Sequence, residues 1–332
     1  MNMRKFLALL HARNMEFLRD RATLFWNLVF PLFLVFGFAF AFSGGTEYLF
    51  KAGVLGNAPK AEPFMQEEYV EFVPYDEADK AAEKLRHHQI DLLIDFDSGT
   101  YLVNRESPKG KAAEKLLLAS PGSPLERREV SGKAIRYVDW LVPGIIGMNM
   151  MFSCIFGVGW VIVRYRKNGV LKRLKATPVR AIQFILAQLF SRLYIVLITA
   201  AIVYAGSNLI LDFIMLGSYL DLLLVTALAT LCMISFGLIF ASRLKSEELA
   251  DGLMNLATWP MMVFSGVFFS MEGTPQVLQW IARAFPLTHY IEAARAIMLD
   301  GAGLVQVAPN LMILALLSAL FLGISALSFK WE

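Results

Sequence analysis

Cysteine is scarce in this sequence, and the common catalytic motifs are missing from it. Only two cysteines occur among 332 residues, Cys154 and Cys232, and both lie inside long apolar runs. This placement argues against a disulfide framework or a metal site, and we expect both thiols to pack as small apolar side chains. The sequence has no G-x-x-x-x-G-K-[ST] loop for nucleotide phosphates, and no Ser/His/Asp set or cluster of metal ligands at a workable spacing. We therefore expect no enzyme activity and no bound cofactor or metal in this chain.

Charge is also in short supply. Charged residues make up 18% of the chain against 57% for hydrophobic residues, and the net charge is only +3. A soluble domain would be nearer half apolar, with shorter apolar runs, so this balance indicates an integral membrane protein. The small positive excess lies mostly in loops beside the apolar runs, where it argues for membrane orientation and against nucleic-acid binding.

Six apolar runs are long enough to cross the roughly 30 Å hydrocarbon layer of a bilayer as α-helices. The basic residues that flank these runs place both ends of the chain in the cytoplasm. The expected fold class is therefore an α-helical integral membrane protein with six transmembrane helices. The spans are expected at 24–42, 138–163, 179–211, 219–240, 249–269 and 311–329.

Residues 1–23 precede the first span and predict an amphipathic helix that lies in the membrane interface. The basic residues Arg4, Lys5, Arg13 and Arg19 lie off the apolar face of this helix. The apolar face is formed by Met3, Phe6, Leu7, Leu10, Phe17 and Leu18. A cleavable signal peptide is not expected, because the following apolar run is too long and offers no convincing cleavage site.

Residues 43–137 differ in kind from the rest, with charges of both signs and no apolar run of membrane length. They predict a small extracytoplasmic α/β domain inserted after the first span, and 138–332 holds spans two to six. The expected strands are 51–55, 90–96 and 100–103, and the expected helices are 76–88 and 109–119. His87 and His88 are adjacent at a helix end, where side chains diverge by about 100°. We therefore interpret them as solvated surface residues rather than metal ligands.

The segment 164–180, RYRKNGVLKRLKATPVR, carries seven basic and no acidic residues between the second and third spans. It predicts a short cytoplasmic helix of about eight residues that opens at Gly169 and is stopped ahead of Pro178. A small apolar stripe runs along it, formed by Val170, Leu171 and Leu174. Thr177 is expected to cap the helix that follows. Charge alone is equally compatible with a basic loop that simply obeys the positive-inside rule.

The pattern in this segment is more specific than its charge. G-x-L-x-R-L-x-A-T-P-V resembles the loop between the second and third spans of the membrane subunits of type V ATP-binding-cassette (ABC) exporters. In that family of six-span permeases the loop holds the coupling helix, which docks into a groove of a separate ATPase. The resemblance gives this role to Gly169, Val170, Leu171, Arg173, Leu174, Thr177 and Pro178. The family often has an acidic residue just before the glycine, whereas this chain has Lys167 and Asn168, so no contact through that carboxylate is expected.

Residues 270–308 carry a second pattern that resembles this family. Two short helices divided by a Phe-Pro pair are expected, and neither is long enough to span a bilayer. They predict a re-entrant hairpin in the outer leaflet, where Glu292 and Arg295 can pair at a spacing of three residues. W-I-A-R-A-F-P-L-T resembles the family's re-entrant segment before the last span, which closes the outer end of the pathway. The residues assigned to this gate are Phe285, Pro286, Thr288, Glu292 and Arg295.

Two features within the apolar runs have alternative interpretations. Arg192 lies about 20 Å along the third span from Pro178, and a guanidinium must face protein or water at such a depth. It either contacts substrate in the pathway or orients the bundle near its inner boundary. The second span is rich in glycine, which serves either a moving pathway or tight helix packing. These glycines are Gly144, Gly147, Gly157 and Gly159.

The resemblance covers nearly the whole chain and implies the translocating subunit of an exporter in the bacterial inner (plasma) membrane. Two copies of a separate ABC ATPase subunit would bind ATP and Mg, and the pathway would lie between this chain and a second permease copy, identical or related. The domain at 43–137 favours a hydrophobic or amphiphilic substrate, such as a drug, a lipid or a peptide-like molecule, with ion export as an alternative. A competing class is a membrane receptor or scaffold that presents this domain outside. A membrane enzyme is a third possibility, with few polar groups to support it.

Overall fold

The computed structural model describes residues 3–41, 49–56, 63–120, 125–132, 136–244, 246–269, 271 and 275–329. The chain forms two compact units. Met1–Phe40 and Val138–Glu332 make up the first unit, and Ala41–Tyr137 makes up the second. The first is a helical bundle and the second has an α/β fold, so the apolar runs and the mixed-charge insertion fold separately. The expected boundary at residues 42 and 43 lies outside the described residues.

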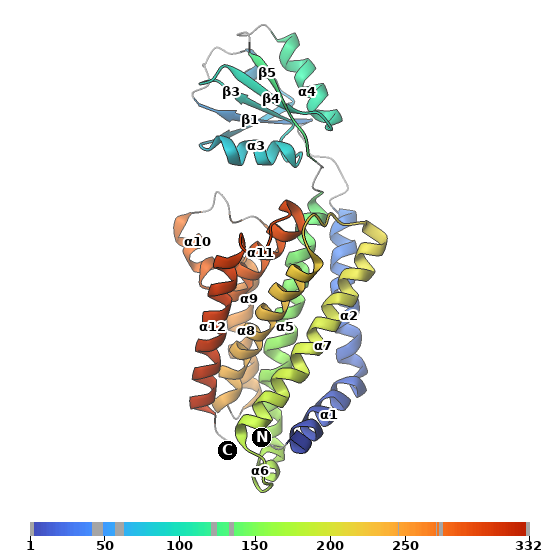
Figure 1. Cartoon of the computed structure of the whole chain (residues 1–332), viewed down its shortest axis with the longest axis vertical. Coiled ribbons are helices and arrows are strands. Elements are labelled where there is room, and N and C mark those ends of the chain that lie inside the picture. The colour runs from blue at the N-terminus through green and yellow to red at the C-terminus, as the bar shows by residue number, and fades with distance from the viewer. Residues whose placement is uncertain are drawn as a thin grey trace. The chain divides into compact units, whose positions relative to one another are not determined.

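Long helices that run between two ends of the bundle form the first unit (Figure 1). The helix α6 and the start of α1 lie at one end, and α10 and α11 lie toward the other. The helices are α1 (Met3–Arg19), α2 (Arg21–Ala41), α5 (Tyr137–Lys167), α6 (Val170–Lys175), α7 (Ala181–Leu211), α8 (Tyr219–Arg243), α9 (Glu247–Phe264), α10 (Gln276–Arg283), α11 (Pro286–Asp300) and α12 (Ala308–Ser328).

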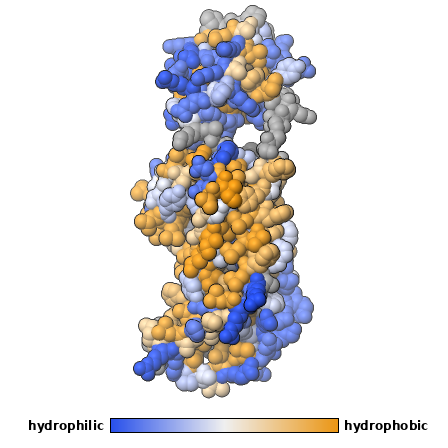
Figure 2. Space-filling view, turned by 90° about the vertical axis from the view of Figure 1, so that its right-hand side faces the viewer, coloured by the Kyte–Doolittle hydropathy of each residue, from blue (hydrophilic) through white to orange (hydrophobic). Residues whose placement is uncertain are grey.

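Five of these helices, α2, α5, α7, α8 and α12, are long and apolar enough to cross a membrane. Figure 2 shows apolar side chains over the middle of the bundle and hydrophilic ones gathered at its lower end. The α-helical membrane fold is therefore confirmed. The helix α9 has 18 residues and carries Glu247, Glu248 and Asp251 in its first turns. The span expected at 249–269 therefore remains a prediction.

Short polar side chains mark where several helices begin. Asp20 interrupts the path from α1 to α2, and its carboxylate accepts the backbone N–H of Thr23 at 3.0 Å. The hydroxyls of Ser107, Ser218 and Ser246 accept backbone N–H groups at the starts of α4 (Pro108–Ala119), α8 and α9 respectively. Each such bond satisfies one of the backbone donors that a helix leaves unpaired at its first turn.

The glycines of α5 lie where neighbouring groups leave no room for a side chain. A Cβ at Gly144 would lie 2.7 Å from the carbonyl oxygen of Val267, and one at Gly147 would lie 2.7 Å from the ring of Tyr290. A Cβ at Gly159 would lie 2.6 Å from the sulfur of Met254. The structure therefore supports the packing interpretation of these glycines. Cys154 and Cys232 are both free and buried in this core, as expected.

The second unit is a five-stranded sheet with the order β2-β1-β3-β4-β5. The strand β1 is parallel to both β2 and β3, β3 and β4 are antiparallel, and β4 and β5 are parallel. Apolar clusters hold a helix on each face of the sheet, one with Ala81 and Leu85 of α3 and the other with Ala113 and Leu117 of α4. The elements are β1 (Phe50–Leu55), η1 (Pro63–Gln66), β2 (Val70–Tyr75), α3 (Ala78–Arg86), β3 (Leu92–Asp95), β4 (Thr100–Asn104), α4 (Pro108–Ala119) and β5 (Glu126–Val130).

Candidate functional site

The basic segment between α5 and α7 forms a tight turn and a short helix. Gly169 has a φ of 70°, a left-handed conformation that suits glycine, and α6 follows it. This helix has six residues, fewer than the sequence predicts. The prediction that Thr177 caps the next helix is wrong, because two further residues separate it from Arg180, which is the N-cap of α7. The Thr177 hydroxyl instead donates to the carbonyl of Leu174 at 2.6 Å and closes the end of α6.

The apolar side of α6 faces the chain's own core. Leu171 is fully buried in the main apolar cluster of the bundle, and Leu174 packs against the same cluster. Leu171 therefore anchors α6 and offers no surface to a partner, which corrects the expectation for this residue. Val170 and Leu174 are half-buried. The exposed side of α6 and its following turn consists of Lys172, Arg173, Lys175, Ala176, Thr177 and Pro178.

Arginine and lysine side chains fix the base of α5 to the loop between α8 and α9. Arg166 is buried, and its guanidinium donates to the carbonyl of Leu244 and, at 3.1 Å, to that of Ser242. Lys167 pairs with Glu247 of α9 at 3.1 Å. Lys167 thus takes its carboxylate partner from α9.

The helix α1 contacts both helices that flank α6. Lys5 donates to the carbonyl of Pro178 at 2.9 Å, just beyond α6. Ser191 of α7 donates to the side chain of Asn14 at 2.6 Å. The sequence places Arg13 off the apolar face, yet Arg13 is buried and donates to the carbonyl of Gly157 in α5 at 2.8 Å. Hydrogen bonds therefore connect α1 to α5, to α7 and to the turn that follows α6.

Arg192 lies in the interior of the bundle and not in lipid. Its Nε donates to the carbonyl of Ser153 in α5 at 2.7 Å, and its Nη2 donates to the same carbonyl and to the Ser153 hydroxyl. The guanidinium also lies over the ring of Phe17, 5.3 Å from its centre. A Cβ on Gly157 would overlap the guanidinium, so this glycine makes the room for it. Arg192 therefore connects α7 to α5 and to α1.

A cavity of about 640 Å³ opens beside Arg192 and is lined by α1, α2, α5, α7 and α9. Its charged lining comprises Arg13, Glu16, Asp20, Arg164, Arg192 and Asp251. Its aromatic lining comprises Phe17, Trp26, Phe30, Phe152, Phe156 and Trp160. A cavity of this size, apolar with a few polar groups, has the usual character of a small-molecule site.

The hairpin of α10 and α11 forms at the Phe-Pro pair, as predicted. Phe285 is the N-cap of α11 and Pro286 is its first residue, where the missing N–H costs nothing. The hydroxyl of Thr288 reaches back to the carbonyl of Ala282 at 2.6 Å. One ring nitrogen of His289 lies 2.8 Å from the Arg283 carbonyl oxygen. Side chains of α11 thus satisfy the carbonyls at the end of α10.

The pairing expected between Glu292 and Arg295 is wrong. Glu292 is exposed and makes no ion pair with any residue that the structure describes. Arg295 instead donates to the carbonyl oxygens of Trp140 in α5, at 3.0 Å, and of Gly266 after α9, at 2.8 Å. Its guanidinium also lies 3.4 Å from the centre of the Trp140 ring. Nearby backbone carbonyls and an aromatic face are available to Arg295, so it joins three elements at this end of the bundle.

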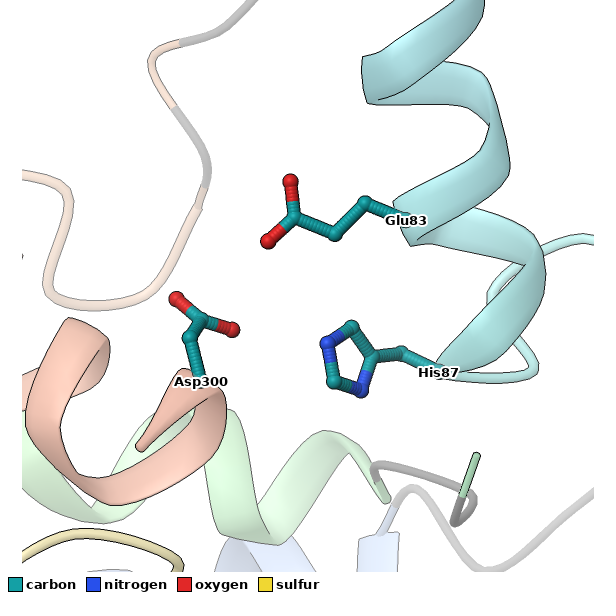
Figure 3. Close-up of side chains that lie close together, drawn as sticks. All are labelled: Glu83, His87 and Asp300. Atoms are coloured by element: carbon teal, nitrogen blue, oxygen red, sulfur yellow. The ribbon is translucent and has the colours of Figure 1, made fainter. Parts of the chain in front are cut away.

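The two adjacent histidines of the second unit do not act together. His88 lies beyond α3 with a φ of 56°, and its Nε2 is 2.8 Å from the carbonyl oxygen of Gly132. His87 is the C-cap of α3, and Figure 3 shows it one turn away from Glu83 on that helix. The third side chain drawn there, Asp300, ends α11. A single imidazole and a single carboxylate of α3 fall short of the four ligands of a structural zinc site.

Comparison with known proteins decides the family. A family model described as ABC-2 family transporter protein matches residues 21–327. The chain belongs to the ABC-2 family. The expected relation to ABC transporter permeases is thereby confirmed, and the chain is a multi-pass membrane protein of this family.

Three curated relatives illustrate the breadth of the ABC-2 family. The inner membrane transport permease YhhJ of Escherichia coli is 26% identical over 183 residues, which are 55% of this chain and 49% of that protein. The probable multidrug ABC transporter permease YbhS of Escherichia coli is 21% identical over 192 residues, 58% of this chain and 51% of that protein. ABC transporter G family member 20 of Dictyostelium discoideum is 25% identical over 256 residues, 73% of this chain and 34% of that protein. The match thus spans about half or less of each relative.

Several residues of the site carry no signal in the sequence. Ser153 and Gly157 look like ordinary small residues of an apolar helix, and Trp140 looks like an interfacial aromatic residue. Their roles follow from the arginines of other helices that reach their backbone carbonyls. A buried arginine in an apolar run was the only available clue, and it does not reveal which carbonyl the side chain meets.

Proposed function

We propose that this chain is the transmembrane subunit of an ABC exporter, driven by a separate ATPase that docks on the exposed side of α6. The observation that carries the proposal is the connection that α6 makes between α5 and α7. Each of these helices has 31 residues, about 46 Å at 1.5 Å per residue, which exceeds the roughly 30 Å of hydrocarbon. A force on α6 therefore reaches two helices that are long enough to cross the membrane with turns to spare.

The proposal assigns the parts of the chain to the two sides of a bacterial inner membrane. The helix α6 and both chain ends face the cytoplasm, α1 lies in the interface, α9 is the fifth of six spans and residues 43–137 form an extracytoplasmic domain. Two ATPase copies carry ATP and Mg, and a second permease copy, identical or related, completes the pathway. The exposed Lys172, Arg173 and Lys175 favour an ATPase groove with acidic residues.

The substrate we propose is a hydrophobic or amphiphilic molecule, such as a drug, a lipid or a peptide-like compound. The aromatic cavity beside Arg192 supports this choice, as does the name of YbhS, a probable multidrug permease. The hairpin around Phe285 closes the outer end of the pathway. Arg295 holds that end closed through the carbonyls of Trp140 and Gly266.

The test is affinity purification of the tagged chain from its native membrane. We expect a stoichiometric ABC ATPase in the eluate, and we expect Lys172→Glu with Arg173→Glu to remove it, because both side chains are exposed and the charge of the surface is reversed. The matched control is Lys111→Glu with Lys115→Glu, an equal reversal on exposed positions of α4. Repeated absence of an ATPase from well-folded chain would refute the proposal and favour the receptor or scaffold class.

A further inference from the structure

Arg192 is a buried cation that no carboxylate neutralises. Only 4% of the residue is exposed. Its Nε and Nη2 bond to Ser153, whereas its Nη1 bonds to no residue that the structure describes. It makes no ion pair with any described carboxylate, and a second cation, Arg13, lines the same cavity. An ionised group buried in a membrane protein is costly unless water, backbone carbonyls or a partner of opposite charge meet it, and of these Arg192 has only the groups of Ser153.

The carboxylates that line the same cavity are engaged elsewhere or lie at its exposed side. Glu16 pairs with Arg13 at 3.0 Å and accepts the hydroxyl of Tyr165. Asp20 accepts both the backbone N–H and the hydroxyl of Thr23. Asp251 is exposed at the start of α9. The unneutralised positive charge is therefore in the buried part of the cavity, and the negative charge is where water reaches.

The cavity also offers a long apolar wall to whatever meets Arg192. Phe30 of α2 and Phe152 and Phe156 of α5 lie along it, with Trp26 and Trp160. The rings of Phe152 and Phe156 are 6.0 Å apart between centres. A volume of about 640 Å³ lies within the usual 300–1,000 Å³ of ligand sites. One fixed cation beside an aromatic wall suits a molecule with one charged end and one apolar end.

We propose that this cavity binds an anionic amphiphile, with its carboxylate or phosphate group on Nη1 of Arg192 and its apolar body along the aromatic wall. The proposal rests on the proposed function, because it names the class of substrate that the exporter takes from the cytoplasmic leaflet. Ser153 fixes the guanidinium by accepting from Nε and Nη2, and this leaves Nη1 for the ligand. Charge-assisted hydrogen bonds of this kind are short and strong.

Gly157 belongs to the same site. A Cβ at this position would overlap the guanidinium of Arg192, so alanine would force the arginine away from Ser153. The proposal therefore expects Gly157→Ala to weaken binding of the anionic amphiphile although it changes no charge. This variant separates the position of the guanidinium from its mere presence.

The experiment is photocrosslinking of full-length chain in phosphatidylcholine nanodiscs with dodecyl phosphate that carries a diazirine on its chain. Competitors are unlabelled dodecyl phosphate, dodecyltrimethylammonium, dodecyl glucoside and inorganic phosphate. We expect crosslinks in residues 148–164, and we expect dodecyl phosphate to compete at concentrations at least about tenfold below the other three, a difference typical of one charged contact. No substitution is needed for this comparison, so it does not depend on a variant that folds.

Variants then test the residues. Arg192→Gln and Gly157→Ala should each weaken dodecyl phosphate at least about tenfold, Arg192→Lys should retain part of the binding, and Arg243→Gln, which removes an exposed charge at the end of α8, should change it less than about twofold. Folding is checked by gel filtration and thermal unfolding. Equal loss in Arg243→Gln, or stronger competition by the cationic or neutral amphiphile, overturns the proposal. Equal competition by inorganic phosphate would show that the site binds a free anion, and it would overturn the proposal that the ligand is an amphiphile.

The failure of this proposal is distinguishable from the failure of the transporter assignment. Suppose that an ATPase copurifies and is lost on substitution in α6, but that dodecyl phosphate is not preferred. The transporter assignment then stands, and the proposal of an anionic substrate is rejected. Selective crosslinking without any associated ATPase supports the site and removes the exporter.

Discussion

Arginines connect the helices of this bundle through hydrogen bonds to backbone carbonyls. Arg13, Arg192 and Arg295 each reach at least one carbonyl oxygen of α5, and Arg166 reaches carbonyls at the end of α8. A carbonyl oxygen has two lone pairs, so it can accept a hydrogen bond from an arginine and keep the hydrogen bond within its own helix.

We predict that Leu171→Ala destabilises the bundle by about 2–4 kcal/mol, the usual cost of truncating a fully buried leucine. Leu171 is 0% exposed and packs in the main apolar cluster. Thermal unfolding in detergent should show the loss. Lys172→Ala, next to it and exposed, should leave the midpoint unchanged, and a similar loss in both variants would contradict the inward placement of Leu171.

We predict that Arg295→Gln loosens the hairpin, since the carbonyls of Trp140 and Gly266 lose charged donors worth about 1.5–3 kcal/mol each. Hydrogen exchange should rise in α10 and α11 and remain unchanged in α6. Arg295→Lys keeps the charge but cannot donate to two carbonyls in the same geometry. Its hydrogen exchange should therefore lie between that of the parent and that of Arg295→Gln. Glu292→Gln is the matched control, because Glu292 is exposed and makes no pair with Arg295. An effect of Glu292→Gln as large as that of Arg295→Gln would show that the pair forms after all.

At the scale of elements, apolar periodicity predicted the helices well and the strands unevenly. The runs at α2, α5, α7, α8 and α12 exceed membrane length, so their existence follows from composition. The strand β5 was missed because its sequence ERREV is almost entirely polar and exposed, and only pairing with β4 makes it a strand. The strand β2 contains Pro74, which argues against a central strand, and β2 does lie at the edge of the sheet.

The site was less predictable than the fold for a related reason. The α6 segment was found from its pattern, but the direction of its apolar stripe depends on what lies under it. Three apolar residues on a six-residue helix fit a partner's groove or the chain's own core equally well, and Leu171 turned out to lie in the core. Sequence periodicity tells which residues share a face, and only the packing tells what that face meets.

At the same scale, we predict that acid weakens the second unit through the contact between α4 and β5. The guanidinium of Arg127 and the hydroxyl of Tyr101 hold the pKa of Glu114 below its ordinary value. The ionised Glu114 therefore stabilises the folded second unit at pH values above its unfolded pKa, near 4.5. This contribution is lost as the pH falls through the lower pKa of the folded state.

Glu114→Gln should therefore cost about 1 kcal/mol near pH 7, since Arg127 is half exposed, and little below pH 3. Burial raises the pKa of Asp91, so Asp91 acts in the opposite direction and the variant must be compared with the parent at each pH. Urea unfolding of the second unit across pH 3–7 measures the difference. A constant difference at every pH would contradict the role of the ionised carboxylate.

At the scale of the whole molecule, two units with separate cores share one chain. The sheet of the second unit carries a helix on each face, and both apolar clusters are formed by residues of that unit. We therefore predict that residues 41–137 fold without the bundle. Expressed alone, they should unfold cooperatively in urea and give dispersed amide signals. Leu85→Ala, which opens a cavity under α3, should lower the midpoint, and Lys84→Ala beside it should not. A disordered spectrum of the parent fragment would show that the unit needs the bundle.

The buried and the exposed residues of α6 have different roles, and this has a consequence for how such transporters diverge. Leu171, which secures this helix, is buried in the core, and Leu174 packs against the same cluster. The residues that a partner can contact are exposed, and they are Lys172, Arg173, Lys175, Ala176, Thr177 and Pro178. Substitutions on the visible side are therefore free to accumulate without harming the fold. A duplicated copy of this chain could acquire a different ATPase partner through changes at these six exposed positions, while the helices behind them stayed the same.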